Sequence, residues 1–162
     1  MAMISVDTFA VTNPAFCSLV IRAFVEGYIT GDPEGSLLPL ILLPIPLVLT
    51  EETAATFAQT KSSTGLIPWL GRYPEVTVML GNRIRGSANV SRQALLFGIR
   101  QRVLTVLPSG RVIPDADGLM RKPSFSTMSE VGKATSLAKR LGTWCGQVRS
   151  AQTILISLGV NR

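Results

Sequence analysis

Apolar residues recur at helical spacing near both ends of the chain. Asn13-Pro14 pairs an N-cap side chain with proline at the first helical position, and the apolar stripe that follows predicts a helix over 13–28. Near the other end, Thr127-Met128-Ser129-Glu130 matches a capping box, which predicts C-terminal helices over 127–159. A second cap at Ser150 and a closing Gly159 define the last of these helices.

The middle of the chain combines two helical patterns with a hairpin. Pro74 is expected to open a helix to about Arg85, and Gly86-Ser87-Ala88-Asn89 to form a turn. Ser91 is then a good N-cap for a second helix. Beyond it, two β-branched runs flank Pro108-Ser109-Gly110, which is typical of a hairpin turn.

This order over residues 74–113 is that of a winged helix-turn-helix unit. We therefore expect a mainly α protein with a small β-hairpin, folded as one winged helix-turn-helix-like domain over residues 1–162.

The run Leu37–Leu49 is apolar throughout and contains three prolines. Proline disfavours both a regular helix and a central strand, so an extended segment is expected here. Because both faces of the run are apolar, both must be covered, either as buried scaffolding or at an interface with another chain. With 13 residues the run is too short to cross a bilayer.

The helix expected after Ser91 has a narrow polar strip. On a helical wheel, Arg92, Gln93 and Arg100 fall within one third of the circle, with Leu96 among them, and most other positions are apolar. A helix that reads bases needs a broader solvated polar face. The pattern favours a buried or partner-facing helix over a base-reading one.

Composition narrows the possible functions. Mean hydropathy is +0.35, although no segment is suited to span a membrane and no signal peptide is apparent, so a cytoplasmic protein is expected. A surface covered by a partner and a generous core explain this hydropathy equally well. The chain has no histidine, its two cysteines lie far apart, and it has no phosphate-binding glycine loop. We expect no enzyme, no metal site and no cofactor.

Charge is divided unevenly between the two halves. Residues 1–80 carry three basic and seven acidic side chains, whereas residues 81–162 carry thirteen and three. A strongly basic half suggests a polyanion or an acidic protein surface as partner. The arginines are scattered singly, which is also compatible with a solvated basic surface.

Several segments together resemble a known family. The segments are NPAFCSLVIRAFVEGY, LPLILLPIPLVL, SRQALLFGIRQRVL, KRLGTWCGQ and TILISLGVNR. In this order they resemble the middle component of bacterial three-component ABC-ATPase systems, almost from end to end. The resemblance implies a non-catalytic adaptor in a conflict or anti-phage defence complex, with an SMC-like ABC ATPase and an effector of the same operon as partners.

Two functional interpretations follow. In the first, the chain is this adaptor, away from any membrane, and its basic half faces DNA bound by the complex. The residues predicted to bind the partner are Leu42, Leu43, Ile45, Leu47, Leu96 and Phe97. In the alternative, it is a free-standing winged-helix DNA-binding transcriptional regulator. The residues predicted to contact nucleic acid are Arg92, Arg100, Arg102 and Arg111.

Overall fold

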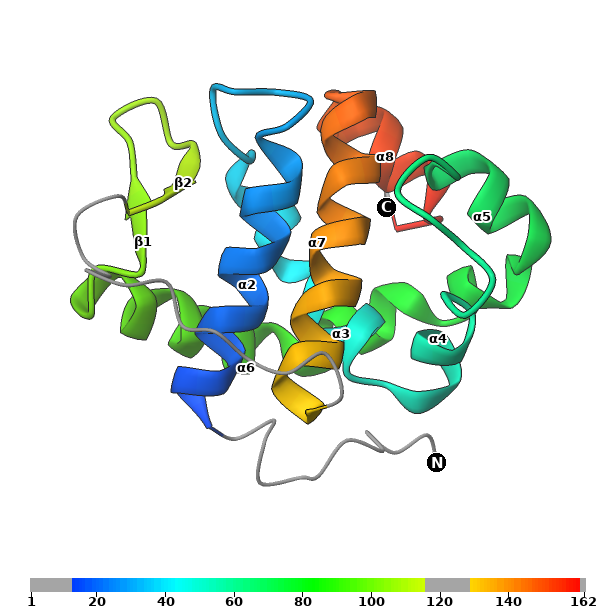
Figure 1. Cartoon of the computed structure of the whole chain (residues 1–162), viewed down its shortest axis with the longest axis horizontal. Coiled ribbons are helices and arrows are strands. Elements are labelled where there is room, and N and C mark those ends of the chain that lie inside the picture. The colour runs from blue at the N-terminus through cyan, green and yellow to red at the C-terminus, as the bar shows by residue number, and fades with distance from the viewer. Residues whose placement is uncertain (1–12, 116–128, 161–162) are drawn as a thin grey trace.

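The computed structural model describes residues 13–115 and 129–160. Two helices, α2 (Pro14–Tyr28) and α7 (Glu130–Val148), lie side by side at its centre (Figure 1). Asn13 caps α2 by accepting hydrogen bonds from the backbone N–H groups of Ala15 and Phe16, so the helix has the predicted bounds. The fold is mainly α with one small hairpin, as predicted.

The two central helices meet backbone to backbone. A β-carbon on Gly27 of α2 would overlap the carbonyl oxygen of Lys139 on α7. From the other side, β-carbons on Gly142 and Gly146 would overlap carbonyl oxygens of α2. Small residues on both helices therefore set the distance between α2 and α7.

The predicted helix-turn-helix is wrong. Residues 86–89 lie inside one continuous helix, α6 (Leu80–Arg100), which crosses behind the lower parts of α2 and α7 in Figure 1. Ser87 and Ala88 are buried, and the Ser87 hydroxyl donates a hydrogen bond to the carbonyl oxygen of Arg83 one turn back. Burial of Ser87 and Ala88 against the core outweighs the weak helix propensity of Gly86, Ser87 and Asn89. The winged-helix detail is therefore not confirmed.

The predicted starts of these two helices, at Pro74 and Ser91, also differ from the structure. Pro74 opens only a short 3₁₀ turn, η2 (Pro74–Thr77), and α6 begins afterwards at Leu80. Ser91 is not an N-cap, because it lies in the interior of α6. Its side chain is fully buried.

The predicted hairpin is confirmed. Strand β1 (Leu104–Val106) pairs antiparallel with β2 (Val112–Pro114), with Thr105 opposite Ile113. Gly110 has φ +87°, a conformation that glycine adopts without strain, and its N–H donates to the Leu107 carbonyl oxygen. Ser36 adds a bridge to Val112 at the other edge of β2.

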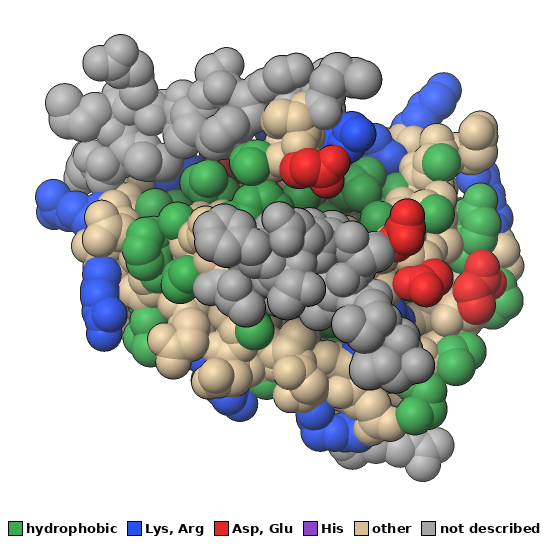
Figure 2. All heavy atoms as spheres, turned by 90° about the horizontal axis from the view of Figure 1, so that it is seen from below, with side chains coloured by type: hydrophobic (Ala, Val, Ile, Leu, Met, Phe, Trp, Pro, Cys, Tyr) green, Lys and Arg blue, Asp and Glu red, His purple; other side chains and the backbone are tan. Residues whose placement is uncertain are grey.

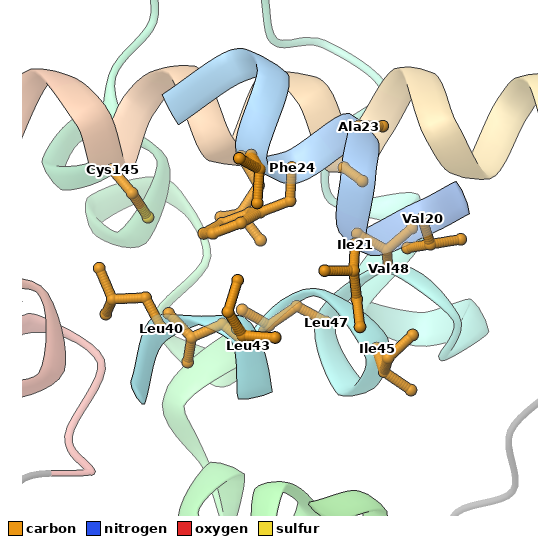
Figure 3. Close-up of a cluster of buried hydrophobic side chains, with 14 of the residues drawn as sticks. Val20, Ile21, Ala23, Phe24, Leu40, Leu43, Ile45, Leu47, Val48 and Cys145 are labelled. Carbon is orange, nitrogen blue, oxygen red and sulfur yellow. The ribbon is translucent and has the colours of Figure 1, made fainter. Parts of the chain in front are cut away.

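The apolar run 37–49 is helical, not extended. It forms a 3₁₀ helix, η1 (Leu38–Leu42), followed by a short α-helix, α3 (Pro44–Val48). Its prolines stand in the first turn of each helix, where a backbone N–H has no partner within the helix in any case. The segment packs under α2, with Leu43 and Leu47 facing Phe24 and Ile21 (Figure 3).

Three further helices complete the described fold: α4 (Glu51–Ala55), α5 (Leu66–Arg72) and α8 (Ala151–Ser157). Ser129 caps α7 and Ser150 caps α8, as predicted, while Thr127 and Met128 of the capping box lie outside the described residues. None of the helices described is both long and hydrophobic enough to cross a bilayer.

Candidate functional site

The predicted partner-binding residues do not form one surface. Leu43, Ile45 and Leu47 are at most 1% exposed and belong to the chain's own core (Figure 3). Leu42 is half-buried in η1, and Leu96 is 46% exposed on α6 next to the half-buried Phe97. Leu42 lies beside the start of α6, and Leu96 lies about three turns further along that helix.

The four arginines predicted to contact nucleic acid separate into two groups. Arg92 and Arg100 are exposed on α6, and Arg102 is exposed just after its end. Arg111 instead serves the fold, because its Nη1 donates to Asp32 Oδ2 at 3.0 Å and to the Gly35 carbonyl oxygen at 2.9 Å. This ion pair ties the hairpin to the loop after α2.

Sequence reasoning missed a hollow between α4, η2 and the start of α6. Its volume is about 710 Å³, and Thr53, Thr56, Val76, Val78, Met79 and Arg83 are among the residues that line it. Val78 and Met79 are each 63% exposed, the largest exposures among the large hydrophobic side chains described. The sequence does not predict the hollow, because the apolar residues over 74–85 have the spacing of one regular helix.

The backbone at Met79 is strained. Its φ of 56° and ψ of 19° are left-handed, a conformation that costs a non-glycine residue about 1–2 kcal/mol. Met79 is also the N-cap of α6, yet no side-chain cap hydrogen bond is made there. Residues held in such conformations cluster at functional sites, so this position is a candidate for binding.

Arg83 joins the three elements around the hollow. Its Nη1 donates to Thr53 Oγ1 in α4, and its Nη2 donates to the Val76 carbonyl oxygen in η2, both at 3.0 Å. Burial lowers the pKa of Arg83, and the nearby Glu52 carboxylate opposes that shift. Through its two hydrogen bonds, the Arg83 guanidinium holds α4 and η2 against α6 and so fixes the walls of the hollow.

Acidic side chains border the same hollow. Glu52 and Glu75 line it and are exposed, and Glu51 is an exposed neighbour in α4. On the face shown in Figure 2, most of the visible acidic side chains lie toward the right, beside hydrophobic ones, and Lys and Arg side chains spread along the margins. The hollow is thus apolar inside and acidic at its rim.

Two smaller hollows continue this one. Met79 and Asn82 also line a hollow of about 180 Å³, which shares Gly81 and Arg85 with a third of about 220 Å³. Leu42 lies in the third, beside Leu155 and Val160. We call the three together the Met79 surface; it extends from α4 past the start of α6 to η1.

The described residues contain no group of three or more His, Cys, Asp or Glu side chains arranged to hold a metal ion. Burial raises the pKa of the Cys17 thiol to about 11 and that of Cys145 to about 12, so both thiols are protonated near neutral pH. The Met79 surface combines exposed apolar side chains with the carboxylates at its rim, a combination suited to binding another protein segment.

Comparison with family models identifies the chain. The model of the ABC-three component (ABC-3C) system Middle Component 3 matches residues 2–162. The chain therefore belongs to the Middle Component 3 family of ABC-three component systems. No curated protein and no solved structure matches it.

Proposed function

We propose that this middle component is a non-catalytic adaptor that docks another subunit of its ABC-three component system on the Met79 surface. The observation that carries the proposal is the exposure of Val78 and Met79, 63% each, beside an apolar hollow that residues 13–115 and 129–160 leave open. Exposed apolar surface of this kind is typical of protein interaction sites, and methionine adapts readily to a partner's shape.

The chemistry of the surface defines the partner segment. Apolar side chains are needed to fill the hollow between α4 and α6, and Lys or Arg side chains to meet Glu51, Glu52 and Glu75 at its rim. An amphipathic helix with basic flanks satisfies both requirements. We assign this helix to a partner subunit, and place the adaptor between an SMC-like ABC ATPase and an effector in a cytoplasmic defence complex.

The test is a tagged pull-down with all components of the system co-expressed. Val78→Glu and Met79→Glu place a carboxylate on the apolar part of the surface, and recovery of the partner should fall about tenfold or more, the loss expected at a central contact. Ile67→Glu is the matched control, because Ile67 is a 56% exposed side chain on α5 that does not line the three hollows.

The control decides the interpretation. Full recovery of the partner with Ile67→Glu, together with loss in the other two variants, supports docking at the Met79 surface. Undiminished recovery with Val78→Glu and Met79→Glu contradicts it. Substitution of Ile45 or Leu47 is unsuitable for this test, because both side chains lie in the core and a charge there unfolds the chain.

The alternative function, a free-standing transcriptional regulator, depended on a helix-turn-helix. That turn is absent from residues 86–89, which are helical. The basic surface on α6 fits a more limited role, a contact with nucleic acid that needs no helix-turn-helix.

A further inference from the structure

Helix α6 has one continuous exposed face. Its 21 residues span about 30 Å, and its exposed positions fall within an arc of roughly 140° on the helical wheel. Three arginines lie on this arc, namely Arg85, Arg92 and Arg100, and Arg102 follows directly after the helix. Successive arginines on this arc are seven or eight residues apart, which is about 10–12 Å along the axis.

The charge on this face is not neutralised by any residue that the structure describes. α6 contains no Asp or Glu. None of these four arginines forms an ion pair with any residue in the described ranges, where the ion pairs are Arg22–Glu26 and Arg111–Asp32. The remaining exposed positions of the first three turns include Asn82, Gly86 and Asn89, so that part is polar as well as basic.

The continuity of α6 changes the interpretation of its polar strip. A helix beginning after Ser91 has a narrow strip interrupted by Leu96, whereas the observed helix extends the same strip by Asn82, Arg85 and Asn89. Exposed large apolar residues on the face are confined to Leu96 and Ile99, near its C-terminal end. A partner helix packed along α6 requires an apolar seam over the whole length, which this face lacks.

We propose that the exposed face of α6 binds the phosphate backbone of double-stranded nucleic acid, without reading its sequence. Arginine, asparagine and glutamine side chains are the usual donors to phosphate oxygens. Proteins that bind single strands also stack bases on aromatic rings, and the only aromatic residue of α6, Phe97, is half-buried and off this arc. The duplex is therefore the better fit.

The test measures binding of the full-length chain to a fluorescent DNA duplex of arbitrary sequence, of about 30 base pairs, over a range of salt concentrations. A triple variant, Arg92→Gln, Arg100→Gln and Arg102→Gln, removes three charges from the face and its C-terminal end, at residues that do not line the Met79 surface. The control, Arg72→Gln, Lys133→Gln and Lys139→Gln, removes three exposed charges from α5 and α7. Both triple variants carry the same net charge, so a difference between them reports the α6 face.

The α6 variant should lose at least tenfold in affinity at low salt, and the slope of log K against log salt should become shallower by roughly two to three, since each phosphate contact contributes about 0.9. The control should lose less than threefold. Equal losses in the two variants, or no binding of the wild-type chain at about 50 mM salt, overturn the proposal. Competition by polyglutamate as strong as that by DNA also overturns it, in favour of an acidic protein surface. Loss of DNA binding leaves the pull-down of the partner unaffected, so this proposal and the adaptor role fail separately.

Discussion

A β-carbon on Gly142 of α7 would overlap the carbonyl oxygen of Phe24 on α2. The two helices touch backbone to backbone at this point, and no side chain separates them. Because Phe24 is itself fully buried under this contact, the position of α7 determines the position of the central apolar side chains of α2. The packing of the core therefore depends on the absence of a β-carbon at Gly142, as it does at Gly27 and Gly146.

The Gly142→Ala variant should be destabilised by about 3 kcal/mol, since neither backbone can yield without moving a whole helix. Gly86→Ala is the matched control, because no described residue outside the local turn of α6 lies within 4 Å of the added β-carbon. The control should gain about 0.5–1 kcal/mol from improved helix propensity. Urea unfolding of both variants measures the difference. Equal stability of the two contradicts the close contact between α2 and α7.

The Ser91→Ala variant tests the position of Ser91 within α6. The buried hydroxyl of Ser91 has no hydrogen-bond partner among the described residues, so its removal should raise the free energy of unfolding by about 1 kcal/mol. If Ser91 instead capped a helix, alanine would cost about 1 kcal/mol. The sign of the change in urea unfolding distinguishes one continuous helix from two.

The Met79→Gly variant separates stability from docking. Glycine adopts the left-handed backbone at residue 79 without strain, so the melting temperature should be unchanged or higher. The same substitution removes the exposed apolar side chain from the Met79 surface, and the partner should be recovered less well in the pull-down. A lower melting temperature of Met79→Gly than of the wild type contradicts backbone strain at residue 79. Full recovery of the partner with Met79→Gly contradicts a docking role for the Met79 side chain.

The Arg111→Met variant should weaken the fold and leave nucleic-acid binding unchanged. Substitution leaves the largely buried Asp32 carboxylate without its cation and the Gly35 carbonyl oxygen without its donor. We expect a loss of about 2–3 kcal/mol, less than for a fully buried pair because the Arg111 side chain is 24% exposed. Thermal unfolding measures the loss. A drop in duplex affinity for the folded variant would place Arg111 in the binding face after all.

Stability should fall at alkaline pH. Burial raises the pKa of Cys17 to about 11 and that of Cys145 to about 12, against an ordinary value of 9.0. Between pH 9 and these values the unfolded chain has released the thiol protons while the folded chain retains them, so folding becomes less favourable as pH rises. The stability is complete below pH 9, and urea unfolding from pH 8 to 11 should show the decline.

The control for this effect is the double variant Cys17→Ala, Cys145→Ala. It should lose some stability at pH 8 from the smaller side chains, but its stability should decline less between pH 9 and 11. Burial also raises the pKa of Tyr28 to about 12, which leaves a residual decline at the alkaline end of the range. An unchanged slope in the double variant assigns the alkaline sensitivity to other groups.

The sequence by itself determined those elements whose signals act within a few residues. The start of α2 follows from Asn13 and Pro14, because the Asn13 side chain accepts from backbone N–H groups two and three residues on. Ser129 and Ser150 begin α7 and α8 in the same way. The hairpin follows from Pro108-Ser109-Gly110, where one glycine takes a positive φ. Such hydrogen bonds and dihedral angles are determined by residues that are close together in the sequence.

The tertiary structure decided where local signals were weak or ambiguous. Residues 86–89 resemble a turn, but burial of Ser87 and Ala88 keeps them helical, and this places Arg85, Arg92 and Arg100 on one face. The prolines of residues 37–49 are tolerated because each stands in the first turn of a short helix packed under α2. The Met79 surface arises where η1 and α4 meet the junction between η2 and α6, three segments that are separated along the chain. Which apolar side chains remain exposed there depends on long-range packing, and no spacing along the chain encodes it.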